Sequence, residues 1–239
     1  MIKLYQFART WGIPNLSSFC VKIETYLRIN KLPYEIEEAL PLKAPRGKLP
    51  FIEDEGNKIP DSRLIVNYLK DKYGDSDKKL LSLEQQAIAK AYERLLEEHL
   101  YWVAIVSRWH YTNENWQTNK QAIFGGLPPV VRDLVAAMTR RKFKGQIIGH
   151  GIGRLTHEEI FGLGKEDIDS LANFLGDKPY LMGDKPTSLD ASAYGILVNT
   201  LGCPIESPLK DYALTKKNLL DYCKRMQMEF FPELPWVAS

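Results

Sequence analysis

The chain has little cysteine. Only Cys20, Cys203 and Cys223 occur among its 239 residues, too few and too scattered for a disulfide framework, and the count suits a reducing compartment. The amino-terminal segment MIKLYQFART lacks the long apolar core of a secretory signal peptide. No apolar run reaches the ~18 residues that a membrane span requires. We therefore expect a soluble, cytoplasmic protein with no membrane span.

Charge of one sign is not in excess either. The 32 lysines and arginines nearly balance the 30 aspartates and glutamates, giving a net charge of +2, so we expect no nucleic-acid partner. The basic run TRRKFKGQ at residues 139–146 is best interpreted as a solvated helix face. The four histidines show no zinc-type spacing with any cysteine, so we expect no metal.

The composition is that of a folded globular protein, with 44% hydrophobic and 26% charged residues. The segment IKLYQF (2–7) is rich in strand formers, and a helical pattern begins at Ser18 and ends before Pro33. Residues 33–39 then alternate in the manner of a second strand. This β-α-β order favours a parallel strand pair with a right-handed crossover.

A hairpin and another helix follow. The hairpin is predicted over residues 49–61, because Glu55-Gly56 separates two short strand-like runs and glycine allows the positive φ of a tight turn. A periodic helix is predicted over residues 62–74. The order β-α-β then β-β-α predicts a thioredoxin-like α/β domain over residues 1–75.

Beyond residue 75 the pattern becomes helical throughout. A charged linker is predicted at residues 76–82, followed by an all-α domain at residues 83–239. Thr187 and Asp190 have the spacing of a capping box at the start of a core helix. Helices are predicted over residues 83–109 and near 128–145, 156–162, 165–176, 187–201 and 214–229.

The stretch LPFI places a proline at the head of a predicted strand. Pro50 can adopt the cis form there, and an extended peptide could pair with the exposed backbone of Leu49. An ordinary proline at a strand edge fits the pattern equally well. The sequence therefore leaves both interpretations open.

Asp61-Ser62 stands at the start of the helix predicted over residues 62–74. Either residue is a normal helix cap, and the spacing alone favours this interpretation. The same helix end offers free N–H groups to a carboxylate, and Asp61 could meet an ammonium group beside it. The pair would therefore suit an α-amino acid head group, which carries both charges.

The stretch NLSSFC begins the first predicted helix. Ser17 or Ser18 can cap that helix, and a hydroxyl there could also donate to a thiolate. Cys20 would lie in the first turn, where the helix end could acidify its thiol. No cysteine stands at position 17, so no CxxC disulfide can form, and Cys20 fits equally a small buried hydrophobic residue.

Aromatic residues and a histidine occur along the long predicted helix. His99 lies on its apolar stripe and is expected to be a hydrogen-bonded core residue. Tyr101, Trp102, Arg108 and Trp109 either line a cleft between the two domains or belong to the core, which is the commoner position of aromatic residues at helical spacing.

Several of these pieces occur together in a familiar order. LPFI, DSRLIVNYL and PTSLDASAYG follow one another across nearly the whole chain, and in this the chain resembles the glutathione transferase superfamily. The segments SSFCVKIETYL, PRGKLPFIED, GIGR with HEEI, and KPYLMGDKPTSLD resemble most closely the failed-axon-connections branch, a relative of the metaxins. The resemblance implies a thioredoxin-like domain followed by an all-helical domain, and a homodimer.

The resemblance also implies a binding site for glutathione as co-substrate. In the superfamily the motif that matches Leu49-Pro50 pairs with the cysteinyl part of glutathione. The acid–serine pair that matches Asp61-Ser62 holds the γ-glutamyl head group. A small hydrophobic electrophile would be the second substrate.

The residue that activates the thiol stands at the start of the first helix in several classes of the superfamily. Here Ser17 aligns with that position, with Ser18 as the competing choice and Tyr5 of the first strand as a weaker one. The link over residues 39–48 is too short for the usual second helix. Lys48 or Arg46 would then take over the contacts to the glycyl end of glutathione.

The leading hypothesis is a glutathione transferase that activates the thiol through Ser17. One alternative is a protein-interaction module that keeps the fold without catalysis, as metaxin-like relatives do. Another is a glutathione-dependent thiol oxidoreductase that works through Cys20.

Overall fold

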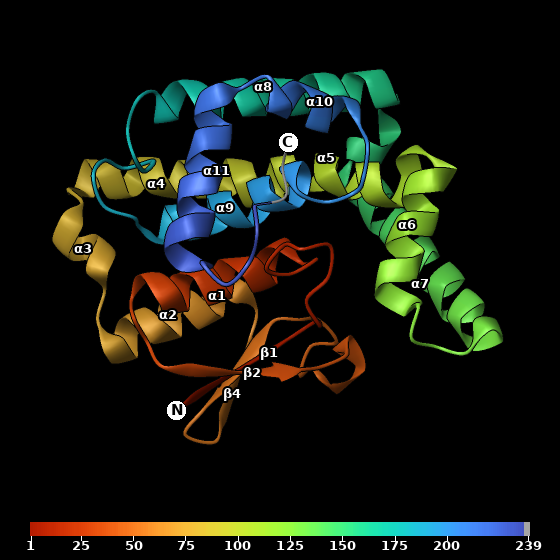
Figure 1. Ribbon diagram of the computed structural model, residues 1–239, viewed down its shortest axis with the longest axis horizontal. Coiled ribbons are helices and arrows are strands. Elements are labelled where there is room, and N and C mark those ends of the chain that lie inside the picture. Colours follow the sequence, from red (N-terminus) through yellow and green to blue (C-terminus); the bar gives the residue numbers. More distant parts are fainter. Residues whose placement is uncertain (237–239) are drawn as a thin grey trace.

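The computed structural model describes residues 1–236, with a four-stranded sheet at one end of the molecule and helices stacked above it (Figure 1). The strand order is β2-β1-β3-β4, in which β1 is parallel to β2 and antiparallel to β3, and β3 is antiparallel to β4. This is the predicted thioredoxin-like order. The strands are β1 (Ile2–Gln6), β2 (Tyr34–Glu38), β3 (Phe51–Asp54) and β4 (Asn57–Pro60).

The hairpin between β3 and β4 turns where the sequence predicts it. Glu55 and Gly56 have φ values of 51° and 82°, and two consecutive positive values are those of the tight turn that matches strand twist. One face of the sheet is covered by α1 (Ser18–Ile29) and α2 (Ser62–Tyr73), which bury Ile2, Leu4 and Ile52. The parallel pair β1 and β2 is joined by α1, as the β-α-β pattern requires.

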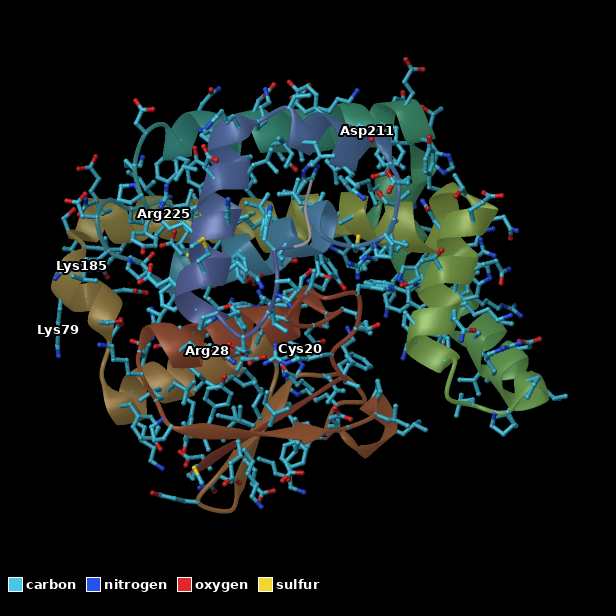
Figure 2. The ribbon with its side chains drawn as sticks, viewed as in Figure 1. Cys20, Arg28, Lys79, Lys185, Asp211 and Arg225 are labelled. Atoms are coloured by element: carbon cyan, nitrogen blue, oxygen red, sulfur yellow. The ribbon has the colours of Figure 1, made fainter. Side chains whose placement is uncertain are left out.

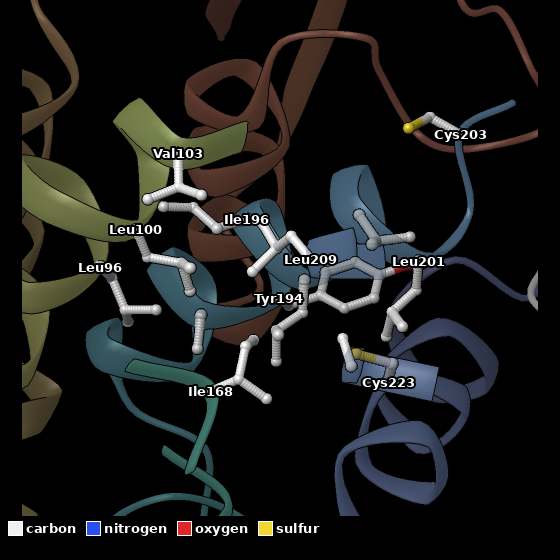
Figure 3. Packing of buried hydrophobic residues seen from close by; sticks show 14 of the residues in the cluster. Leu96, Leu100, Val103, Ile168, Tyr194, Ile196, Leu201, Cys203, Leu209 and Cys223 are labelled. Atoms are coloured by element: carbon white, nitrogen blue, oxygen red, sulfur yellow. The ribbon is translucent and has the colours of Figure 1, made fainter. Parts of the chain in front are cut away.

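The remaining helices pack around α9 (Ser188–Leu201). Residues 189–201 of this helix are all buried, because it contacts α1 on one side and α4, α10 and α11 on others. Figure 3 shows Leu96, Leu100 and Val103 of the long helix facing Ile196 of α9 in this core. The other helices are α3 (Ser76–Leu80), α4 (Leu83–Arg94), α5 (Tyr101–Val106), α6 (Asn113–Phe124), α7 (Pro129–His150), α8 (His157–Leu175), α10 (Pro208–Leu214) and α11 (Lys217–Phe230).

The long helix predicted over residues 83–109 is one helical rod with two irregular turns. Between α4 and α5 lies a π-helical segment, η2 (Leu95–Leu100), and after α5 lies another, η3 (Ser107–Tyr111). Segments of this kind occur frequently at functional sites. The two short 3₁₀ turns are η1 (Pro41–Lys43) and η4 (Ile152–Arg154).

Several helices differ from the sequence-based prediction. The helices predicted near 156–162 and 165–176 form the single helix α8. Gly164 lies inside this helix and packs closely against α5, since a Cβ added to it would come to 2.8 Å from Val103. Here glycine serves close packing rather than a helix end. The helices α6 and α10 were not predicted.

The residues predicted as a linker contain α3. Asp75 caps this short helix by accepting hydrogen bonds from the amides of Asp77 and Lys78. Asp77 in turn accepts from the amide of Ser188 at the start of α9, at 3.1 Å. The segment is therefore fixed against the helical part.

A buried ion cluster joins the two layers of the molecule. Lys22 of α1 is 1% exposed and its Nζ lies 2.9 Å from Glu93 Oε1 and also contacts Glu97. Burial opposes the charge on Glu93, but Lys22 and Lys90 bring the pKa of that carboxyl down to about 2. The charges of this cluster are therefore mutually compensated.

Within residues 1–236, no single helix combines the length and the apolar character needed to cross a bilayer, although α6 and α7, bent by 116° at their junction, together satisfy both criteria.

Candidate functional site

Ser17 caps α1 with its side-chain hydroxyl. Its Oγ accepts a hydrogen bond of 3.4 Å from the amide of Cys20, and its own amide donates to Asn15 Oδ1 at 3.1 Å. The residue is half-buried, whereas Ser18 is buried. Because Oγ receives its bond from an amide, the hydroxyl keeps its own proton to donate, either to the neighbouring Cys20 sulfur or to an anion placed before the helix. Of the two predicted serines, Ser17 has the more suitable position.

Cys20 lies one turn further, inside the molecule. It is 0% exposed and packs with Leu49 and Phe51; Figure 2 places it between the sheet and the helices above. Burial raises the pKa of its thiol to about 12, although hydrogen bonds from Ser17 and from the Phe7 backbone act in the opposite direction. A protonated, enclosed thiol is a packing residue, which opposes the oxidoreductase hypothesis.

The Leu49-Pro50 peptide is cis. Leu49 and Pro50 are both buried, and the pairing of β3 with β1 begins only at Phe51, opposite Tyr5. The backbone of Leu49 therefore precedes the sheet ladder. Since Cys20 and Leu49 belong to the same small buried cluster, the start of α1 lies close to this segment.

Asp61 begins α2 in a left-handed conformation, with φ 71°. Its carboxylate accepts a hydrogen bond of 3.0 Å from the amide of Arg63, so the predicted cap is present. Asp61 is exposed while Ser62 is buried. A carboxylate in solvent beside the positive end of a helix can meet a zwitterionic head group.

The starts of α1 and α2 border the same part of the long helix. The Phe19 ring of α1 lies 4.8 Å from the Tyr101 ring, and Arg63 of α2 donates to Glu98 at 3.1 Å. Glu98 and Tyr101 are one turn apart on the rod. The predicted residues around positions 17 and 61 are therefore brought together against one helix face.

The carboxyl end of α7 closes the same region. His150 stacks on Trp102 with ring centroids 4.9 Å apart, and its Nε2 lies 3.0 Å from the carbonyl oxygen of Glu98. Tyr101 and Trp102 are half-buried. The prediction that these two aromatic residues line a space between the layers is consistent with this placement, because neither residue is fully buried.

Other residues of the predicted set lie in the core or away from the site. Trp109 is buried and stacks on Phe143 with 4.1 Å between ring centroids, so it belongs to the core. His99 pairs with Asp167 at 2.5 Å, as expected of a hydrogen-bonded histidine, but its side chain is 37% exposed, which corrects the prediction that it lies in the core. Tyr5 stacks on Phe51 and its hydroxyl lies 3.5 Å from Glu53.

Three residues of this region were missed or misplaced by the sequence reasoning. Arg108, which was predicted to line a cleft or to lie in the core, is buried and donates to the carbonyl oxygen of Leu16 at 2.6 Å. Asn15 donates to Phe7 O at 2.7 Å, and Asn199 of α9 donates to Asn15 O at 3.0 Å. The polar cluster at residues 15–18 was a visible signal for Asn15, but no local pattern marks Asn199.

A cavity of about 120 Å³ lies elsewhere, between the α3 segment and α4. Its charged groups are already paired, as Lys70 with Asp77 at 2.6 Å. None of the predicted site residues lines it.

Family models and known sequences both match this chain to glutathione S-transferases. Residues 18–115 match the family model of the glutathione S-transferase N-terminal domain, and residues 164–226 match that of the C-terminal domain. The isoprene-epoxide–glutathione S-transferase of Rhodococcus sp. strain AD45 is 37% identical over 238 residues, covering 96% of this chain and 99% of that protein. The chain belongs to the glutathione S-transferase superfamily.

Two further relatives indicate to which branch of the superfamily the chain is similar. Failed axon connections of Drosophila melanogaster is 36% identical, covering 98% of this chain and 59% of that protein. Metaxin-1 of Mus musculus is 27% identical, covering 97% of this chain and 75% of that protein. These matches confirm the resemblance that the sequence motifs carry, including its metaxin-like branch.

Solved structures support the same fold. The beta-etherase LigF of Sphingobium sp. strain SYK-6 superposes with a TM-score of 0.63 at 17% identity, covering 97% of this chain and 99% of that one. A glutathione S-transferase of Methylobacterium radiotolerans, solved with glutathione sulfonate, gives a TM-score of 0.60 at 17% identity, covering 100% of this chain and 96% of that one.

Within the superfamily this chain departs from the common pattern between β2 and β3. The described segment there contains only the 3₁₀ turn η1, so the second helix of the domain is absent as predicted. Arg46 and Lys48 are both exposed. They remain the cationic side chains nearest in sequence to Leu49, and their role is still a prediction.

Proposed function

We propose that this chain binds glutathione and activates its thiol through Ser17 for conjugation to a small electrophile. The observation that carries the proposal is that the starts of α1 and α2, which hold Ser17 and Asp61, contact Tyr101 and Glu98 of the long helix through Phe19 and Arg63. Leu49 shares a buried cluster with Cys20 of α1. Family membership supports the choice of glutathione.

Each part of glutathione has a partner of suitable chemistry in this arrangement. The γ-glutamyl ammonium group would meet the exposed carboxylate of Asp61, and its carboxylate the first amides of α2. The cysteinyl segment would pair with the backbone of Leu49, which lies outside the sheet ladder. The sulfur would then lie before α1, within reach of Ser17.

The reaction needs a thiolate at neutral pH. Once the thiol has lost its proton to solvent, the Ser17 hydroxyl would donate a hydrogen bond to the sulfur. The positive end of α1 also favours the negative charge of the thiolate. The thiolate then attacks a carbon of the electrophile. Because a 37% identical relative is named for an epoxide, a small alkene epoxide is the first class to test: a C–S bond forms, the C–O bond breaks, and the alkoxide takes a proton from water.

The electrophile would rest on apolar surface beside the sulfur. Phe19 of α1 and Tyr101 and Trp102 of the long helix provide it, with ring centroids 4.8 Å and 5.5 Å apart. All three are half-buried. A small, weakly polar molecule fits such a surface better than a charged one.

Replacement of Ser17 by alanine tests this proposal. The rate of glutathione consumption with an alkene epoxide should fall about 10²-fold, as expected when one donor to a developing or stabilised anion is lost. Ser82→Ala is the matched control, because Ser82 also caps a helix, accepting from Gln85 N at 3.2 Å, but at the far end of α4.

Loss of a cap alone costs about 1 kcal/mol of stability in both variants. Equal rates in Ser17→Ala, Ser82→Ala and the wild type would reject Ser17 as the activating residue. A melting curve for each variant shows that the comparison is made on folded protein.

A second candidate function is a protein-interaction module without catalysis. One observation favours it: α7 exposes Val130, Leu134 and Met138, with exposed fractions of 82%, 63% and 64%, at one-turn spacing. Such a stripe is typical of contact surfaces. Ser62→Ala separates the two functions, because the transferase loses affinity for glutathione whereas a partner held by α7 is unaffected.

A further inference from the structure

The turn that carries Ser17 is held from the helical part of the molecule. Arg108 Nη1 donates to the carbonyl oxygen of Leu16 at 2.6 Å, which belongs to the peptide bond that enters Ser17. Arg108 Nη2 donates to Asn199 Oδ1 at 2.6 Å and to Asn199 O at 3.0 Å. Two helical elements, η3 and α9, therefore fix the residue before Ser17.

Asn199 extends this hold to the rest of the turn. Its Nδ2 donates to Asn15 O at 3.0 Å and to Gly195 O at 3.1 Å. Asn15 is itself 0% exposed, and its Oδ1 accepts the amide of Ser17. The carbonyl oxygens of the two residues that precede Ser17, Asn15 and Leu16, thus accept buried hydrogen bonds from Asn199 and Arg108.

The charge on Arg108 has neutral partners only. The residue is 8% exposed, its hydrogen bonds go to carbonyl and amide oxygens, and its guanidinium lies 5.2 Å from the centre of the Trp11 ring. Among the described residues no carboxylate forms an ion pair with it. A buried cation without a counter-ion favours an anion placed nearby.

The buried cluster at Lys22 shows the contrast. There the ammonium group meets Glu93 and Glu97, so its charge is neutralised inside the fold. Both cations come from the same interface between α1 and the helical part. Among the described residues, Lys22 thus has carboxylate partners, whereas Arg108, beside the Ser17 turn, has none.

We propose that Arg108, oriented by Asn199, is a positioning residue that makes the thiol bound at Ser17 more acidic. Arg108 holds the Ser17 turn in place, and its positive charge, which no carboxylate compensates, stabilises the thiolate form of the bound thiol. The inference rests on the proposed function, because it concerns the thiol of bound glutathione.

The pKa of glutathione bound to the full chain tests the proposal. Thiolate absorbance is titrated with pH in the wild type, in Asn199→Asp and in Arg108→Lys. Asn199→Asp keeps an acceptor for Arg108 but supplies the missing carboxylate, so the thiol pKa should rise by about one unit. Arg108→Lys keeps the charge but not the forked contact with Leu16 and Asn199, so a rise is expected here too.

Arg140→Lys is the matched control. Arg140 also donates to a backbone carbonyl, that of Trp109 at 3.0 Å, and lies 4.7 Å from the Trp116 ring, but on α7. It should leave the thiol pKa unchanged.

The outcomes separate the two proposals. If Asn199→Asp and Arg108→Lys fold, bind glutathione and keep the wild-type thiol pKa, the role of Arg108 is structural only and the inference is overturned. If one variant does not fold, the other decides in the same way. If the wild type binds no glutathione, the proposed function fails, and the inference falls with it.

Discussion

Ser17 and Cys20 stand one helical turn apart and meet opposite environments. The Ser17 hydroxyl lies at the half-buried start of α1, while the Cys20 thiol is enclosed by Leu49 and Phe51. The helix end that can favour an anion at Ser17 cannot acidify Cys20, because burial outweighs it and raises the thiol pKa to about 12. The same turn therefore separates a candidate catalytic group from a packing residue.

The Cys20 environment predicts an unreactive thiol. At pH 8 the native protein should not react with a thiol-specific chromogenic reagent, because all three cysteines are buried and Cys20 stays protonated. Cys20→Ala should keep the conjugation rate of the wild type. Complete loss of activity in this variant, with the fold intact, would favour the oxidoreductase hypothesis instead.

At the residue scale the sequence could predict the local features. A cap was predicted at Ser17 or Ser18 and another at Asp61 or Ser62, and in the structure Ser17 and Asp61 accept the helix amides. Arg108 and Asn199 could not be paired in advance, because 91 residues separate them and their contact depends on how α9 packs against the rod. Local spacing carries no information about such a contact.

The position of the proposed site depends on the contact between α1 and α9. Gly195 of α9 faces the first turn of α1, where an added Cβ would fall well inside contact distance of Ser18 O and 3.2 Å from Lys22 N. Only a residue without a side chain lets the two backbones approach so closely. The Ser17 turn is therefore seated directly on α9.

Gly195→Ala should separate these helices. We expect destabilisation of about 1–3 kcal/mol from overpacking against backbone atoms that cannot move aside. Gly162→Ala on α8 is the control, since an added Cβ there meets nothing within 4 Å, and it should raise stability by about 0.5–1 kcal/mol. Urea denaturation measures both; equal midpoints would contradict the close approach of α1 and α9.

Element order could be predicted better than element limits. The Thr187–Asp190 capping box and the Glu55-Gly56 turn are local signals, and both are present in the structure. The helix α6 was missed because its start, Thr112, lies beside the irregular end of the rod, and α8 was divided because glycine normally ends a helix. In both places tertiary packing outweighs local propensity.

The whole molecule places an α/β layer that can hold a peptide-like ligand against a helical layer that completes the site. In Figure 1, α1 and α2 lie between the sheet and the helices α9 and α4 to α5. The groups proposed to bind glutathione come from the first layer, while Tyr101, Trp102 and Arg108 come from the second. This division follows the superfamily architecture, and the proposed activity would require both layers.

Calorimetric titration of the full chain with glutathione is the most direct test of this account. We predict saturable heat in the wild type at millimolar glutathione, and at least tenfold weaker binding in Asp61→Ala, because a charge-assisted contact of about 1.5–3 kcal/mol is lost. Asp71→Ala, an exposed carboxylate later on the same helix, should bind like the wild type. The absence of heat and of any thermal shift with the wild type at millimolar glutathione would contradict the central claim.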